Sequence, residues 1–214
     1  MQTGICYLFG AGTCPGALPQ LRQGDFVMAI DGGFRHLQQA GIRPNLLVGD
    51  FDSLEAVPAE VETMQLPREK DDTDMLAGLR EGLRLGFSTF HIYGGTGGRF
   101  DHTMANVQCL AYLAKSGAQG FLFGEDTVIT AITQGELRFP AGAEGTLSAL
   151  ALTDKVTGVY EEGLLYPLNN ATLTNGFPIG VSNAFTGAAS RVAVEEGVLL
   201  VIYPREVLPE GQEG

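Results

Sequence analysis

The sequence predicts an α/β fold, with an N-terminal, mostly parallel sheet that carries helices on both faces, followed by a C-terminal antiparallel β-sandwich. Two observations predict this fold class. Over residues 1–125, short apolar runs alternate with segments of helical periodicity, as in parallel strands joined by right-handed crossovers. From residue 126 onward, short β-rich runs are separated by glycine, proline and asparagine, and no helical period remains. We therefore expect two domains, at residues 1–125 and 126–214.

The strands of the first domain are expected at five apolar runs: "GICYLFG" (4–10), "FVMAIDGG" (26–33), "NLLVGDF" (45–51), "STFHIYGG" (88–95) and "GFLFG" (120–124). Helical patterns occupy residues 34–41, 74–86 and 105–117. The second helix has the clearest pattern: Asp72 or Thr73 can cap it, and Gly86 can end it. Its apolar positions recur at helical spacing, at Leu76, Leu79 and Leu83.

The second domain is expected to be built from short strands alone. The β-rich pieces are "TVITAITQGELRFP" (127–140), "GTLSALALT" (145–153), "GVYEEGLLYPL" (158–168), "ATLTNGF" (171–177) and "SRVAVEEGVLLVIYP" (190–204). Several short strands with turn residues at this spacing are typical of an antiparallel sandwich.

Composition restricts the partners and the compartment. The 214 residues include 13 Lys and Arg against 25 Asp and Glu, a net charge of -12. Such a chain repels duplex nucleic acid and anionic membranes, so we expect a small-molecule partner and neither of these. Cys6, Cys14 and Cys109 are odd in number and lack metal-ligand spacing, which indicates reduced thiols and a cytoplasmic protein. No segment has the pattern of a signal peptide or a membrane span.

Glycines and aspartates follow the predicted parallel strands, where open α/β sheets bind their ligands. The segments are "GAGTCPG" (10–16), "DGG" (31–33), "GDFDS" (49–53) and "GGTGGRFDH" (94–102). Glycine lets backbone N–H groups approach a phosphate closely. Asp50 and Asp52 are two positions apart, so in an extended segment their side chains lie on the same side. Their carboxylates can then converge on one point, where a divalent cation would relieve their repulsion. The pattern predicts a Mg²⁺ site for a phosphorylated ligand.

Each of these segments also has a structural interpretation. "GAGTCPG" lacks the third glycine of a dinucleotide fingerprint at the right position and can be a turn. Asp31 and "KDDTD" (70–74) can cap helices, and "GGTGGRFDH" can be a solvated turn. His102 can be a surface histidine, and His36 and His91 belong to no constellation. The sequence has no P-loop and no G-x-S-x-G elbow, which excludes those two enzyme classes. Its aspartates, its glycines and the isolated cations Lys70 and Arg99 fit phosphoryl-type transfer by positioning and charge neutralisation.

Taken in order, "DGG", "PNLLVGDFDS", "KDDTD", "GGRFDHTMAN", "GLLYPL" and "GVSNAF" resemble the motifs of the thiamine pyrophosphokinase (thiamine diphosphokinase) family, over residues 7–203. The resemblance implies transfer of pyrophosphate from ATP to the hydroxyl of thiamine, which yields thiamine diphosphate and AMP with Mg²⁺. It implies a homodimer with an α/β ATP- and Mg-binding catalytic domain at 1–125 and a β-sandwich thiamine-binding domain at 126–214. In the family the thiamine site lies between the domains and uses both subunits.

The resemblance also implies roles for individual residues. The Mg²⁺ ligands would be Asp50, Asp52 and Asp74. Asp71 and Asp101 would line the reacting centre, with Asp101 the weaker candidate for activating the thiamine hydroxyl. Phosphate charge would be neutralised by Lys70 and Arg99, and the nucleotide pocket would be shaped by Asp31, Gly32, Gly33, Gly95 and Gly98. Ser182 and Asn183 would contact the thiamine pyrimidine. Ala184 stands where many bacterial relatives have an acidic residue, which leaves the exact pyrimidine contacts open.

Other functions are compatible with parts of this pattern. A related pyrophosphokinase could act on a hydroxymethyl pterin, and a non-catalytic protein could bind a nucleotide or thiamine. The crowded aspartates disfavour a pure binder, because binding alone has little use for them. A dehydrogenase would depend on "GAGTCPG" alone.

Overall fold

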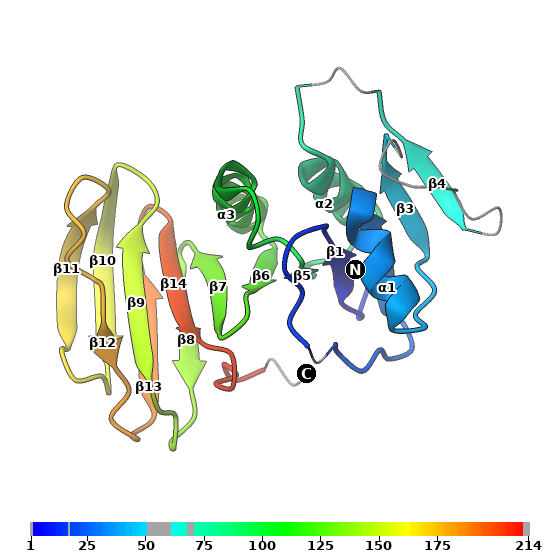
Figure 1. Cartoon of the computed structure of the whole chain (residues 1–214). Coiled ribbons are helices and arrows are strands. Elements are labelled where there is room, and N and C mark those ends of the chain that lie inside the picture. The colour runs from blue at the N-terminus through cyan, green and yellow to red at the C-terminus, as the bar shows by residue number, and fades with distance from the viewer. Residues whose placement is uncertain (1, 17, 51–60, 68–70, 212–214) are drawn as a thin grey trace. The chain divides into compact units, whose positions relative to one another are not determined.

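The computed structural model describes residues 2–16, 18–50, 61–67 and 71–211. Two compact units are present: Met1–Cys109 with Gly117–Glu125, and Leu110–Ser116 with Asp126–Gly214 (Figure 1). Within the described ranges, no helix is long and apolar enough to cross a membrane.

The first unit is built on a parallel sheet with the strand order β6-β5-β1-β2-β3-β4. The strands are β1 (Cys6–Phe9), β2 (Phe26–Ile30), β3 (Leu46–Gly49), β4 (Glu62–Gln65), β5 (Thr89–Tyr93) and β6 (Gln119–Phe123). The sequence predicts all of them except β4. Three of the four residues of that edge strand are exposed, so it has no apolar run to reveal it.

The helices are η1 (Asp31–Gly33), α1 (Phe34–Gln39), α2 (Asp74–Arg84) and α3 (Phe100–Lys115). The connection through α1 leads from β2 outward to β3, whereas that through α2 leads from β4 back across the sheet to β5. Right-handed crossovers in opposite directions place α1 and α2 on opposite faces. The predicted fold class is thus confirmed.

One boundary was wrong: α3 begins at Phe100 instead of residue 105, so Asp101 and His102 belong to its first turn.

Helix α2 confirms the predicted cap and end, and of its three predicted apolar positions Leu79 is buried. The hydroxyl of Thr73 accepts a hydrogen bond from the backbone N–H of Leu76 at 3.2 Å, and Gly86 has a φ of 92°. The buried side of the helix carries Met75, Ala77, Gly78, Leu79 and Gly82, whereas Leu76 and Leu83 are half-buried. A Cβ on Gly82 would lie 2.5 Å from Phe90 Cε1. Glycine at this position therefore lets the helix backbone lie close to the sheet, beside the buried Leu79.

The second unit consists of antiparallel strands in two sheets, which confirms the predicted C-terminal β architecture (Figure 1). The orders are β11-β10-β13-β8 and β12-β9-β14-β7. The strands are β7 (Thr127–Ile132), β8 (Gly135–Phe139), β9 (Thr146–Ala151), β10 (Lys155–Glu162), β11 (Leu168–Thr174), β12 (Asn183–Ala184), β13 (Ser190–Val194) and β14 (Leu199–Pro204). Phe139 on β8 packs edge-on against Tyr203 on β14, with ring centroids 5.1 Å apart, so buried aromatic rings join the two sheets.

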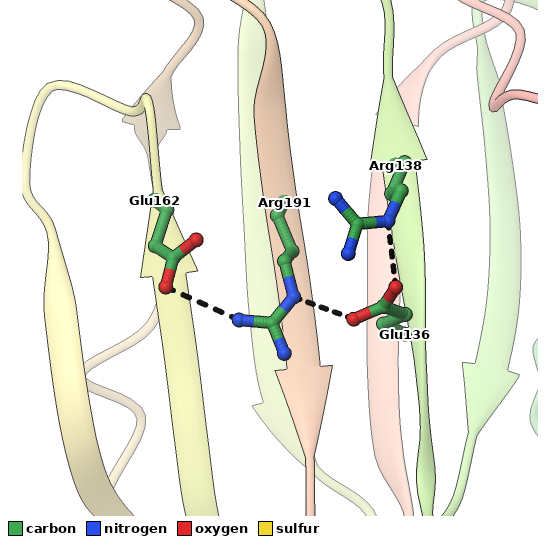
Figure 2. A network of polar contacts seen from close by, with 4 residues as sticks. All are labelled: Glu136, Arg138, Glu162 and Arg191. Atoms are coloured by element: carbon green, nitrogen blue, oxygen red, sulfur yellow. Dashed lines mark hydrogen bonds and ion pairs between the residues drawn. The ribbon is translucent and has the colours of Figure 1, made fainter.

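An ion-pair network crosses three strands of the four-stranded sheet (Figure 2). Arg191 on β13 contacts Glu136 on β8 at 2.5 Å and Glu162 on β10 at 3.1 Å, and Arg138 contacts Glu136 at 2.6 Å. Exposed pairs of this kind contribute little to the free energy of folding. The network marks a solvated face of the sheet.

Candidate active site

The carboxyl ends of β1, β2 and β3 meet at a pocket of about 470 Å³ in the first unit, within the usual size range of small-molecule sites. Three of its lining residues, Asp31, Gly32 and Asp50, are ones that the sequence predicts. The others are Ala11, Arg35, His36 and Gln39. The structure thus brings part of the predicted rim together in one place.

Asp31 is held in an unusual backbone conformation beside Asp50. Its φ is 48°, in the left-handed region that few residues other than glycine adopt. One carboxylate oxygen, Oδ1, is buried, and it lies so close to Gly49 that a Cβ there would overlap it. The strand end at residue 49 therefore needs glycine, because the Asp31 carboxylate occupies that space. Backbone strain of this kind is typical of functional sites.

The glycines of the neighbouring loops serve mainly to let two backbones touch. A Cβ on Gly94 would overlap the carbonyl oxygen of Gly10, and a Cβ on Gly12 would overlap that of Thr96. The loops are also joined by backbone hydrogen bonds of 2.8 Å from Gly12 N to Gly94 O and from Thr13 N to Thr96 O. "GAGTCPG" is therefore a packed turn in this structure. Its glycines shape the rim through backbone contact.

Two further predicted glycines are also tightly packed, whereas a third is open. A Cβ on Gly33 would overlap the carbonyl oxygen of Phe9. Gly95 is buried, and its carbonyl oxygen accepts a 2.7 Å hydrogen bond from Asn106 Nδ2. Gly98 has a φ of 65° with open space where a Cβ would lie. Any role of these three in nucleotide binding stays a prediction.

Arg99 and Asp101 form an exposed ion pair with hydrogen bonds of 3.1 and 2.5 Å. The Arg99 guanidinium lowers the pKa of Asp101 below the usual range of a carboxyl group. A carboxylate with a lowered pKa is a weak base, which disfavours Asp101 as the group that activates a hydroxyl. Neither residue is among the described lining of the 470 Å³ pocket.

The "KDDTD" segment has a clear structural role at the start of α2. Thr73 caps the helix, Asp72 contacts Arg80, and Asp74 lies in the first turn, where a negative charge is favourable. Asp71, which directly precedes Asp72, is exposed. Lys70 and Asp52 lie outside the described residues. Catalytic or metal-binding roles for these residues therefore stay predictions.

No group of three or more His, Cys, Asp or Glu side chains within the described ranges is arranged to hold a metal ion. The pocket does place two carboxylates, Asp31 and Asp50, on its lining. Carboxylate oxygens are the hard donors that Mg²⁺ prefers, and this ion is usually held by one or two of them together with waters and substrate phosphates. The donor chemistry of the pocket therefore fits Mg²⁺.

The sequence interpretation missed the contribution of α1 to the pocket. Arg35, His36 and Gln39 line it, and His36 Nε2 is hydrogen-bonded to the carbonyl oxygen of Gly12 at 2.9 Å. His36 thus ties α1 to the glycine loop after β1. The pattern that could have revealed these residues is "DGG" itself, because a helix that begins at the sheet rim carries its first turn along that rim.

In the second unit, Ser182 and Asn183 lie at the start of β12. Ser182 is exposed, with a φ of 63°, and its backbone N–H donates to Ser148 Oγ at 3.1 Å. Asn183 is only 6% exposed. The motif pair therefore combines one accessible residue in a strained conformation with one buried residue.

Two family models match the chain, in the order of its two units. They are "Thiamin pyrophosphokinase, catalytic domain" over residues 19–122 and "Thiamin pyrophosphokinase, vitamin B1 binding domain" over residues 135–199. Among curated proteins, the thiamine pyrophosphokinase of Bacillus subtilis is 29% identical over 185 residues, which cover 82% of this chain and 85% of the relative. Thiamin pyrophosphokinase 1 of Caenorhabditis elegans is 27% identical over 154 residues, 67% of this chain and 63% of the relative.

Solved structures agree with these matches. The thiamine pyrophosphokinase of Bacillus subtilis superposes with a TM-score of 0.82 at 26% identity and covers 94% of this chain and 99% of its own. A thiamin pyrophosphokinase family protein of Enterococcus faecalis gives a TM-score of 0.76 at 27% identity, with 95% and 99% covered. The class is thus a transferase with a catalytic domain followed by a vitamin-binding domain. The chain belongs to the thiamin pyrophosphokinase family, enzymes that transfer pyrophosphate from ATP to thiamine.

Proposed function

We propose that this chain is a Mg²⁺-dependent thiamine diphosphokinase that converts thiamine and ATP into thiamine diphosphate and AMP. The observation that carries the proposal is the pocket at the carboxyl ends of β1 to β3, where Asp31 and Asp50 lie together in a chain that matches both domains of the family. ATP would bind to residues 1–125 and thiamine to residues 126–214.

In this proposal, Asp50, Asp52 and Asp74 hold Mg²⁺, which would neutralise charge on the triphosphate when bound. Asp31, Gly32, Gly33, Gly95 and Gly98 shape the nucleotide pocket. Lys70 and Arg99 neutralise phosphate oxygens. Arg35 supports them, because it supplies a positive charge on the lining of the same pocket as Asp31 and Asp50.

The chemical step joins the thiamine hydroxyl oxygen to the β-phosphorus of ATP while the bond from that phosphorus to the bridging oxygen breaks. AMP leaves with the bridging oxygen, and the hydroxyl proton is released to water. A primary hydroxyl is a poor nucleophile, so the rate depends on holding it in line and on neutralising charge on the phosphoryl oxygens. Asp71 and Asp101 would line this centre. The lowered pKa of Asp101 suits a role in orientation better than one in proton removal.

The remaining parts of the proposal concern thiamine, assembly and location. Ser182 would contact the pyrimidine of thiamine, and the enzyme would act as a homodimer in the cytoplasm. The second unit exposes more than half of each of Tyr166, Phe177 and Ile179, and a partner subunit would cover apolar residues of this kind. All three cysteines are free thiols, which suits a reducing compartment. Sedimentation analysis that returned a monomer at all concentrations would contradict the homodimer.

Phosphorus NMR of a reaction with ATP, thiamine and Mg²⁺ tests the activity. We expect thiamine diphosphate and AMP in equal amounts, no ADP, and no reaction after chelation of the metal. Accumulation of ADP would contradict pyrophosphoryl transfer. A parallel reaction with a hydroxymethyl pterin distinguishes the related pyrophosphokinase, and binding of ATP without turnover of either acceptor would indicate a non-catalytic protein.

A further inference from the structure

The side-chain amide of Asn183 has no hydrogen-bonding capacity left for a ligand. Its Oδ1 accepts from the backbone N–H groups of Tyr166 and Ala184, both at 2.9 Å. Its Nδ2 donates to the carbonyl oxygen of Tyr166 at 2.7 Å and to Glu161 Oε2 at 2.5 Å. An asparagine amide offers two acceptor sites and two N–H groups, and all four are used here.

The partners also determine which way the amide points. Two backbone N–H groups can be satisfied only by the amide oxygen, whereas a carbonyl and a carboxylate can be satisfied only by the amide nitrogen. Because Asn183 is also buried, a direct contact with thiamine would require breaking one of these bonds. The second residue of the "SN" motif is therefore part of the scaffold.

Glu161 anchors this scaffold from the other sheet of the second unit. It lies on β10 and is 2% exposed, whereas Asn183 lies on β12, so their hydrogen bond joins the two sheets. Burial raises the pKa of the Glu161 carboxyl above its ordinary value. Its other oxygen, Oε1, is buried and has no hydrogen-bond partner among the described residues. A buried carboxyl group is costly to keep unless it has a specific role.

The pair holds two segments: one carries Ser182, the proposed thiamine contact, and the other carries Tyr166 of the "GLLYPL" motif. Asn183 holds the backbone of Tyr166 at both its N–H and its carbonyl group, and Ala184 O accepts from Leu165 N at 2.9 Å. Ser182 precedes Asn183 directly and sits at a strained φ of 63°. A strained residue keeps its conformation only where its surroundings hold it.

We propose that Glu161 and Asn183 form a positioning pair that fixes Tyr166 and Ser182 for binding of the thiamine pyrimidine. This inference rests on the proposed function and deepens it, since it assigns Asn183 a positioning role in place of a ligand contact. Glu161 is a further member of the site and acts through Asn183. Neither residue takes part in binding ATP.

Steady-state kinetics of Glu161 variants test the pair. We expect Glu161→Ala to raise the KM for thiamine roughly ten- to a hundredfold, the range for a modest misplacement of contact groups, while the KM for ATP stays within about twofold. Glu161→Gln should retain a near-normal KM for thiamine, because its amide oxygen can still accept from Asn183 Nδ2. The matched control is Glu162→Ala at the adjacent exposed position, where both KM values should be unchanged.

A second variant keeps the outcome decisive. If Glu161→Ala does not fold, Glu161→Asp replaces it, because the shorter side chain keeps the carboxylate but withdraws it from Asn183. A normal KM for thiamine in the folded variant, or an equal rise in both KM values, would overturn the positioning pair. Failure of the wild-type protein to make thiamine diphosphate would instead overturn the proposed function.

Discussion

The pocket of the first unit and the Glu161–Asn183 pair of the second hold their motif residues in opposite ways. Asp31 and Asp50 line the pocket at strand ends and are partly exposed. Asn183 is buried, and its amide is fully hydrogen-bonded within the fold. The two regions therefore differ in exposure: the aspartates lie on a pocket lining, whereas the Asn183 amide is enclosed by the fold and has all its hydrogen bonds inside it.

Replacing Asp50 tests the pocket of the first unit and should have the largest effect on activity. Asp50→Asn keeps the shape of the side chain but removes its charge, so we expect kcat to fall roughly a thousandfold, as when a group that stabilises the transition state is removed. The melting temperature should stay close to that of the wild type. Steady-state assays and calorimetry measure the two quantities.

The matched control is Asp126→Asn, at an exposed aspartate of the turn between β6 and β7. Its kcat should be unchanged. If Asp50→Asn also kept a normal kcat, Asp50 would be a support residue like Asn183, and the comparison would fail.

The glycines of the rim test whether backbone contact holds the pocket. Gly94 and Gly98 have similar φ values, 61° and 65°, but only a Cβ on Gly94 would overlap the carbonyl oxygen of Gly10. Gly94→Ala should lower the free energy of unfolding by about 3 kcal/mol, from the left-handed φ and the overlap together. Gly98→Ala should lower it by about 1 kcal/mol, from φ alone. Equal losses in urea denaturation would contradict a packed rim.

Thr73 tests whether "KDDTD" supports the fold or binds a ligand at that position. Thr73→Ala removes the cap of α2 and should lower the free energy of unfolding by about 1 kcal/mol. Thr73→Ser, which keeps the hydroxyl, should restore most of it. A large fall in kcat with unchanged unfolding in urea would instead place Thr73 among the ligand contacts.

Breaking the ion-pair network in Figure 2 should have the smallest effect on stability, because the network lies on a solvated face. Arg191 and Arg138 lower the pKa of Glu136, so its contribution to stability is present above the ordinary pKa of glutamate and is lost as the pH falls through the lowered value. Glu136→Gln should shift the melting temperature less than Thr73→Ala does at neutral pH. NMR titration of the Glu136 carboxyl measures the pKa, and an ordinary value would contradict the network.

Local chemistry explains which elements sequence reasoning found. The buried parallel strands and the capped start of α2 have strong patterns, because apolar runs and capping residues act within a few positions of each other. The edge strand β4 has no such pattern, since three of its four residues face solvent. The early start of α3 was missed because Phe100 and Asp101 follow two glycines that suggest a turn.

The order of strands, helices and acidic motifs along the chain determined the fold class and the family. Each of these elements and motifs is made of residues that are near one another in sequence. Only the tertiary structure decided which motif residues are accessible. Arg35 and His36 reach the pocket, and Asn183 is buried against Glu161, through contacts between segments far apart along the chain. Such contacts depend on how sheets and helices pack, and no local periodicity encodes them.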